Sequence, residues 1–190
     1  TLNYGTAGIG TNPHIAGELF NHLGKAKLVA VHFKGGGPGL IAAMSGEVSA
    51  TFTNIAETSG FVRARKLRAI AVTSPRRSPA FPELATVAES GLPGYEFVTW
   101  FGPLAPAKTP RAIVNRWNLE LKRAMEEPFY KELLAKQRID ARPGAPEELD
   151  TLLKTQLKQF AELMSIVGMA NETNRLVSGY QVEIDDRFKT

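Results

Sequence analysis

The first 73 residues alternate between short apolar segments with strand character and segments with helical character. The strand-like segments begin near residues 1, 28, 50 and 67, which leaves room for one helix in each interval. In the first interval, Ile15, Leu19 and Leu23 recur every four residues and so lie on one helical face. Strands that alternate with single helices are typical of βαβ units and a parallel sheet. We therefore predict an α/β fold with strands at 2–4, 28–33, 50–54 and 67–73 and helices at 12–23, 38–44 and 57–65.

The second half of the chain has a different pattern, in which proline-rich loops precede long amphipathic helices. Proline-containing pairs between Ser74 and Gly94 predict a loop, and residues 95–104 have the pattern of an extended segment. The helical segments have apolar faces but no sheet of their own to pack on, so we expect the first half or further chain to cover them. The predicted helices are 110–125 with Thr109 as N-cap, 129–137, and 146–167 with Gly168 as C-terminal cap.

Composition narrows the chemistry of the chain. It has 190 residues, of which 43% are hydrophobic, and a formal net charge of +4, as in globular proteins with a substantial core. The absence of cysteine excludes disulfides, thiolate metal sites and thiol nucleophiles. No stretch approaches the roughly 18 consecutive apolar residues of a membrane span, so we expect a soluble chain. Its first residues, Thr-Leu-Asn-Tyr, form no leader, and we expect that a secretion signal has been removed upstream.

Basic residues gather at one place in the sequence, namely Arg63, Arg65, Lys66, Arg68, Arg76 and Arg77. A basic patch attracts polyanions when it dominates the charge of a domain. Because the net charge is modest, we interpret this cluster as a solvated face and expect no nucleic-acid partner.

A glycine-rich loop follows the first strand and leads into the first helix, with the sequence Gly5-Thr6-Ala7-Gly8-Ile9-Gly10-Thr11. Such a turn directs backbone N–H groups and the positive end of a helix dipole at one point, which suits a carboxylate or a phosphate. The glycine spacing differs from the dinucleotide motif, and Thr11 stands where a P-loop has lysine. The loop therefore predicts anion binding and disfavours nucleotides, with a tight packing turn as the alternative.

Further candidates are expected at the same edge of the sheet. The segment Gly35-Gly36-Gly37-Pro38-Gly39 follows the second strand, and Asn54 ends the third. Open α/β sheets bind ligands at the carboxyl ends of their strands. His14 lies in the first turn after the glycine loop, where it either reaches a bound anion or packs as a structural histidine.

The sequence contains no recognisable catalytic set. It has no Gly-x-Ser-x-Gly elbow, no Ser-x-x-Lys and no nucleophile with a visible activator. His14 and His22 are eight residues apart without an accompanying carboxylate cluster, so we expect no metal and no cofactor. These observations predict a binding protein and not an enzyme.

Five stretches, taken together and in order, resemble one protein family. They are Tyr-Gly-Thr-Ala-Gly-Ile-Gly-Thr with His-Ile-Ala-Gly-Glu-Leu-Phe (4–20), His-Phe-Lys-Gly-Gly-Gly-Pro (32–38), Lys-Leu-Arg-Ala-Ile-Ala-Val-Thr-Ser (66–74), Val-Ala-Glu-Ser-Gly-Leu-Pro-Gly-Tyr-Glu (87–96) and Trp-Phe-Gly-Pro-Leu-Ala-Pro-Ala-Lys-Thr-Pro (100–110). Over residues 1–170 the chain is similar to the substrate-binding proteins of tripartite tricarboxylate transporters, the periplasmic solute receptors also called Bug proteins.

The resemblance implies a periplasmic binding protein of the type II-like fold, whose two domains close on a small carboxylate such as a dicarboxylate, citrate or an acidic amino acid. It also implies a periplasmic location and presentation of the ligand to a membrane permease. Residues 1–97 would form the family's second domain, and 98–170 the returning hinge and the closing helices of the first. The tail 171–190 does not match the family's usual ending, and the family's N-terminal half-domain has no counterpart in this sequence.

By position, the family's ligand loop corresponds to five residues of this chain. Their backbone N–H groups would hold one carboxylate, and the hydroxyl at the helix start would add a donor. The resemblance implies these residues as ligand contacts: Thr6, Ala7, Gly8, Gly10 and Thr11. We add His14 and Asn54 as further ligand-binding candidates.

Two other functions stay open. The first is an α/β enzyme or regulatory domain that binds a phosphorylated ligand or nucleotide at the same loops. The second is a fragment that binds no ligand and covers its apolar helix faces by self-association, although the family's members are monomers.

Overall fold

The first part of the chain is built on a three-stranded parallel sheet. The computed structural model describes residues 1–137, 139 and 141–166. Strand β1 (Asn3–Thr6) lies in the centre, between β2 (Val29–His32) and β3 (Ala50–Thr51). Tyr4 is in register with Ala30 on one side and Ala50 on the other, and both pairings are parallel. The predicted α/β class with a parallel sheet is confirmed.

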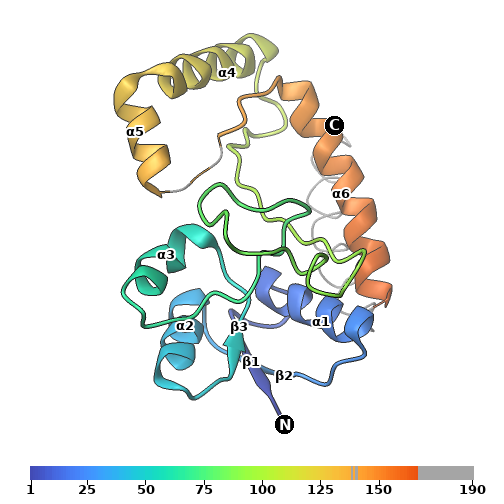
Figure 1. Ribbon diagram of the computed structural model, residues 1–190. Coiled ribbons are helices and arrows are strands. Elements are labelled where there is room, and N and C mark those ends of the chain that lie inside the picture. The colour runs from blue at the N-terminus through green and yellow to red at the C-terminus, as the bar shows by residue number, and fades with distance from the viewer. Residues whose placement is uncertain (138, 140, 167–190) are drawn as a thin grey trace. The chain divides into compact units, whose positions relative to one another are not determined.

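Helices cover both faces of the central strand (Figure 1). The side chain of Tyr4 lies against α1 (Asn12–Gly24), where a Cβ built on Gly17 would be 2.2 Å from the tyrosine ring. On the opposite face, a Cβ on Gly5 would be 3.2 Å from the carbonyl oxygen of Gly39 in α2 (Gly36–Ser45). Because neighbouring residues of a strand point to opposite faces, α1 and α2 pack on different sides of the sheet.

The core of this part surrounds Tyr4 and Tyr95, which are 0% and 1% exposed. The Tyr95 hydroxyl donates a hydrogen bond to the carbonyl of Ala16 at 2.9 Å and so ties the segment after Gly94 to α1. Other buried apolar residues are Ile15, Ala16, Leu19, Leu40, Ala42, Val48, Val72, Phe81, Val87 and Phe97.

The predicted fourth strand is wrong. Within 67–73, Val72 alone forms a ladder contact, an isolated parallel bridge to Thr86. Its N–H donates to the carbonyl of Ala85, and its carbonyl accepts from Val87. The segment therefore pairs with the loop that follows it and not with the sheet. The third strand is also shorter than predicted, because the chain turns after Thr51 to begin α3 (Ile55–Arg63).

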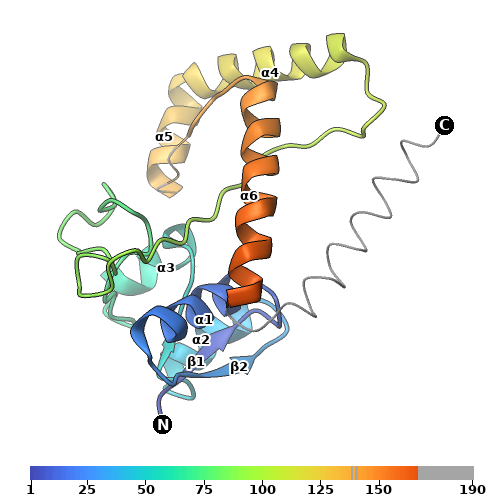
Figure 2. The ribbon, with the colours of Figure 1, turned by 90° about the vertical axis from the view of Figure 1, so that its right-hand side faces the viewer.

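The chain divides into two compact units, the first of which contains residues 1–100 and the end of the last helix from Leu163. The second unit contains α4 (Arg111–Glu126), α5 (Pro128–Gln137) and most of α6 (Pro146–Ile166). Figure 2 shows that α6 is one continuous helix. The first of these helices begins after Pro110, one residue later than predicted.

Within the second unit, Arg111 forms an ion pair with Glu147, and the Asn118 amide donates to the carbonyl of Gly144 at 2.9 Å. The apolar side chains Ile113, Trp117 and Phe129 are exposed, and self-association through them stays a prediction. The predicted cap Gly168 and the tail 171–190 lie outside the described residues. Among the described helices, none is both long enough and apolar enough to cross a bilayer.

Candidate ligand-binding site

The parallel sheet brings three loops to one edge. Loop 7–11 leaves the carboxyl end of β1, loop 33–35 leaves β2, and 52–54 leaves β3. The first two are joined directly, since the N–H of Gly35 donates to the carbonyl of Ala7 at 3.2 Å. Asn54 is the N-cap residue of α3, and its amide nitrogen lies 3.4 Å from Glu57 Oε1. This is the edge at which open α/β sheets bind ligands.

Loop 7–11 is a closed turn with two residues in conformations that favour glycine. Gly8 has a φ of 130° and Gly10 a φ of 73°, a region that costs a residue with a Cβ roughly 1–2 kcal/mol. Thr11 is the extended N-cap of α1, and its hydroxyl donates to the carbonyl of Gly8 at 2.7 Å. The glycines therefore set the shape of the loop that delivers the chain into α1.

The protein itself satisfies part of the loop's hydrogen-bonding capacity. The N–H of Gly8 donates to Thr6 Oγ1 at 3.2 Å, and the N–H of Gly10 donates to His14 Nδ1 at 3.1 Å. Within the described chain, the N–H groups of Ile9 and Asn12 have no protein acceptor. Asn12 is the first residue of α1, where the helix dipole favours negative charge, and Ile9 precedes it in loop 7–11.

His14 is a buried histidine that contacts the loop from inside the protein. It is 8% exposed, and the acceptor role of Nδ1 toward Gly10 places the ring proton on Nε2, which lies 4.0 Å from Glu18 Oε1. Its ring makes an edge contact with the ring of His32, with the centroids 4.6 Å apart. Burial, and secondarily the charge of His32, lower the pKa of His14, against an opposing effect of Glu18. The lowered pKa therefore favours the neutral form of the imidazole at neutral pH.

His32 belongs to this cluster, although the sequence analysis did not select it. Its Nδ1 lies 2.8 Å from Thr6 Oγ1, which also accepts the N–H of Gly8. The parallel register pairs Thr6 with His32 at the ends of β1 and β2. The signal that could have identified it is the position of the histidine just before the second glycine loop, at the end of a strand next to the first.

The lowered pKa of His14 predicts a stability that depends on pH. Because the unfolded chain binds a proton near pH 6.5 and the folded chain binds it at lower pH, stability decreases as the pH falls below about 6.5. Below the folded pKa both states are protonated, and the decrease stops. We expect urea denaturation of His14→Gln to lack this step, while the exposed His22→Gln control retains it. If the decrease in stability below about pH 6.5 is unchanged in His14→Gln, another group binds the proton.

Comparison with known proteins identifies first the fold class of the chain and then its protein family. The chain superposes on the periplasmic binding protein BugD with a TM-score of 0.76 and 28% identity, over 88% of this chain and 57% of BugD. It therefore has the fold of periplasmic binding proteins. The model of the tripartite tricarboxylate transporter family receptor matches residues 1–169. The chain belongs to this family, whose members are solute-binding receptors and not enzymes.

Relatives with curated sequences differ in how much of their length the chain spans. It is 35% identical to the UPF0065 protein in the tcbD-tcbE intergenic region of Pseudomonas sp. (strain P51), over 86% of this chain and 49% of that protein. It is 29% identical to the UPF0065 protein in the clcB-clcD intergenic region of Pseudomonas knackmussii, over 90% of this chain and 100% of that protein. The chain thus spans about half the length of the first relative and the full length of the second.

Two similar structures contain carboxylates. R. palustris Rpa4515, solved with adipate, superposes with a TM-score of 0.82 and 28% identity, over 88% of this chain and 56% of that chain. MatC from Rhodopseudomonas palustris, solved with bound malate, superposes with a TM-score of 0.74 and 29% identity, over 87% of this chain and 56% of that chain. Among the described residues of the present chain, no group of three or more His, Cys, Asp or Glu side chains could hold a metal ion.

Proposed function

We propose that this chain is the ligand-binding part of a periplasmic solute receptor that captures a small dicarboxylate and delivers it to a tripartite tricarboxylate-type permease. The proposal rests on the family to which the chain belongs, together with the ligands that two similar structures hold. The family model covers nearly the whole described chain, and two similar structures hold adipate and malate, which are both dicarboxylates.

One carboxylate would bind at loop 7–11, in front of α1. Among the described residues, the N–H groups of Ile9 and Asn12 have no protein acceptor, and the helix dipole adds a favourable field at Asn12. The residues Thr6, Ala7, Gly8, Gly10 and Thr11 would shape the loop around the carboxylate. In this proposal His14 acts through the N–H of Gly10 and Thr6 acts through the N–H of Gly8.

The second carboxylate would lie along the same edge, toward loop 33–35 and Asn54. The Asn54 amide now contacts Glu57 at 3.4 Å, a long hydrogen bond that a ligand carboxylate can replace. Closure of a second domain over this edge would exclude water from the ligand, and the closed form would be the one that the permease recognises.

A thermal-shift screen tests the proposal. Ligands are malate, adipate, succinate, citrate, glutamate, a matched monocarboxylate and a set of nucleotides. A bound dicarboxylate at about 100 times its Kd adds about 2.7 kcal/mol, which for a chain of this size raises Tm by roughly 5–10 °C. The monocarboxylate is expected to give a smaller shift. A shift with nucleotides and none with carboxylates would contradict the proposal.

A further inference from the structure

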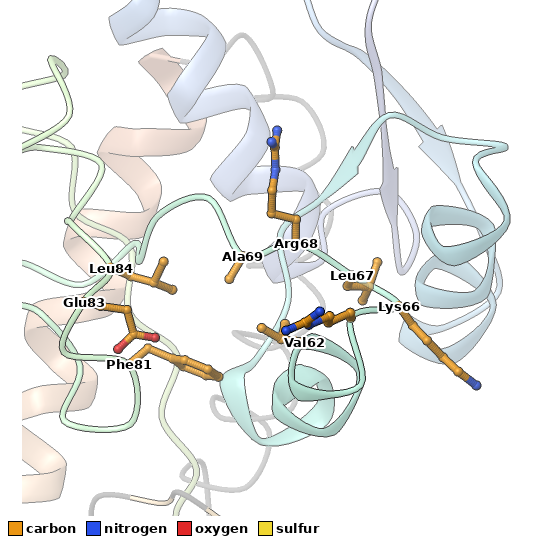
Figure 3. A pocket seen from close by; sticks show the side chains of 9 residues that line it. Val62, Lys66, Leu67, Arg68, Ala69, Phe81, Glu83 and Leu84 are labelled. Atoms are coloured by element: carbon orange, nitrogen blue, oxygen red, sulfur yellow. The ribbon is translucent and has the colours of Figure 1, made fainter.

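A pocket of about 390 Å³ opens in the first unit, away from the residues of the candidate ligand site. One wall is formed by Val62 of α3 and the segment 65–69, and the other by the segment 81–84 (Figure 3). None of the lining residues belongs to loop 7–11 or to loop 33–35, and Asn54 is not among them. The volume is at the low end of the range of about 300–1,000 Å³ that small-ligand pockets occupy.

Five of the nine residues that line the pocket are apolar. Figure 3 shows Phe81 and Leu84 extending across the pocket toward Val62 and Ala69. Phe81 is 8% exposed and therefore forms a fixed wall, whereas Val62, Ala69 and Leu84 are half-buried. Such a surface suits an inserted aliphatic or aromatic side chain, because burial of apolar surface stabilises a complex.

Positive charges lie along one wall of this pocket, the segment 65–69. Arg65, Lys66 and Arg68 line the pocket and are exposed, and within the described part of the chain none of them has an ion-pair partner. The one acidic lining residue is Glu83, so three cations against one anion leave a formal charge of +2. Arg77, by contrast, is neutralised by Glu89 at 2.9 Å.

The directions of the charged side chains distinguish between kinds of partner. A site for a compact anion has donors that converge on one point. Figure 3 shows that Lys66 and Arg68 extend away from each other, and that Lys66 also points away from Phe81 and Leu84. Diverging charges beside an apolar surface match an extended partner with several separated negative charges.

We infer that this surface, defined by Arg65, Lys66 and Arg68 along one wall of the pocket and by the apolar lining residues beside them, docks an acidic segment of a partner protein that inserts one apolar side chain. Acidic side chains of the segment lie over the three cations, and its apolar residue contacts Phe81, Leu84 and Val62. Opposite charges at such a surface increase the association rate and select the register. This docking does not depend on the carboxylate site at loop 7–11.

The test is fluorescence anisotropy of the purified chain with the labelled peptide Glu-Asp-Glu-Leu-Glu-Asp-Glu. We expect saturable binding that weakens at least about tenfold in Lys66→Glu/Arg68→Glu. The matched control Lys25→Glu/Lys27→Glu changes the net charge equally at exposed lysines outside the pocket, and it should alter Kd less than about twofold. Replacing the central leucine of the peptide by glycine should weaken binding about tenfold.

Several outcomes would overturn the inference. Equal losses in both double variants would mean that net charge, not this surface, attracts the peptide. Unchanged affinity for the glycine peptide would exclude the apolar contact. Competition by citrate at equal carboxylate concentration would indicate a site for compact anions. Binding to vesicles containing phosphatidylglycerol, with none to the peptide, would indicate a membrane surface instead.

Discussion

Gly17→Ala is expected to lower the free energy of unfolding by about 2–3 kcal/mol, because the added methyl group clashes where α1 packs on the central strand. A Cβ on Gly17 would lie 2.2 Å from the ring of Tyr4. That ring is fully buried, and its hydroxyl donates its one proton to Glu18 Oε1 at 2.7 Å and lies 3.2 Å from the carbonyl oxygen of His14. The ring therefore cannot move aside without loss of this hydrogen bond.

The matched control for this prediction is Gly60→Ala in α3, where an added Cβ meets no atom within 4 Å. Alanine is a better helix former than glycine by about 0.5–1 kcal/mol, so this variant should be neutral or more stable. Urea denaturation followed by far-UV circular dichroism measures both variants. Equal stabilities for the two would show that the packing of Tyr4 against α1 does not constrain position 17.

Gly10→Val is expected to weaken dicarboxylate binding by about tenfold to a hundredfold, and this prediction rests on the proposed function. Gly10 has a φ of 73°, which a β-branched residue adopts only at a high cost. The loop would have to change shape, and with it the hydrogen bond from the N–H of Gly10 to His14 Nδ1. The N–H groups of Ile9 and Asn12 would then change their positions relative to each other.

The control variant Gly94→Val tests whether backbone strain by itself weakens ligand binding. Gly94 has a φ of 86° and lies outside the three loops of the sheet edge, so this control should lose comparable stability but retain its affinity for malate. Isothermal titration calorimetry of the two variants below their melting temperatures gives the comparison. An affinity of Gly10→Val equal to that of the unmodified chain would remove loop 7–11 from the site.

Local sequence patterns were sufficient to predict most of the first unit. The four-residue repeat of Ile15, Leu19 and Leu23 predicted α1, and the β-branched segment before the second glycine loop predicted β2. The strand predicted at 67–73 failed because local propensity does not specify a partner. Its residues are as apolar as those of a strand, but Val72 pairs with the nearby 85–87 segment, so tertiary context overrode the pattern.

The sequence was sufficient to predict which loops form the candidate site, but not the side-chain contacts within it. The position of the glycines after β1 follows from sequence, as does the shared edge of the loops. The contact between His14 and His32 depends on the register that pairs Thr6 with His32, which no spacing along the chain specifies. For the same reason, the sequence could not indicate that the N–H groups of Gly8 and Gly10 bind protein acceptors.

The most direct test of the central claim is a titration of the ¹⁵N-labelled chain with malate, followed by two-dimensional ¹H–¹⁵N NMR. The account predicts saturable shifts of the amide signals of Ile9 and Asn12, with smaller shifts at Gly8, Gly10 and Asn54, and no change in α5. Saturable shifts confined to other parts of the chain, or no shifts at millimolar malate, would contradict the assignment of the carboxylate site to this edge of the sheet.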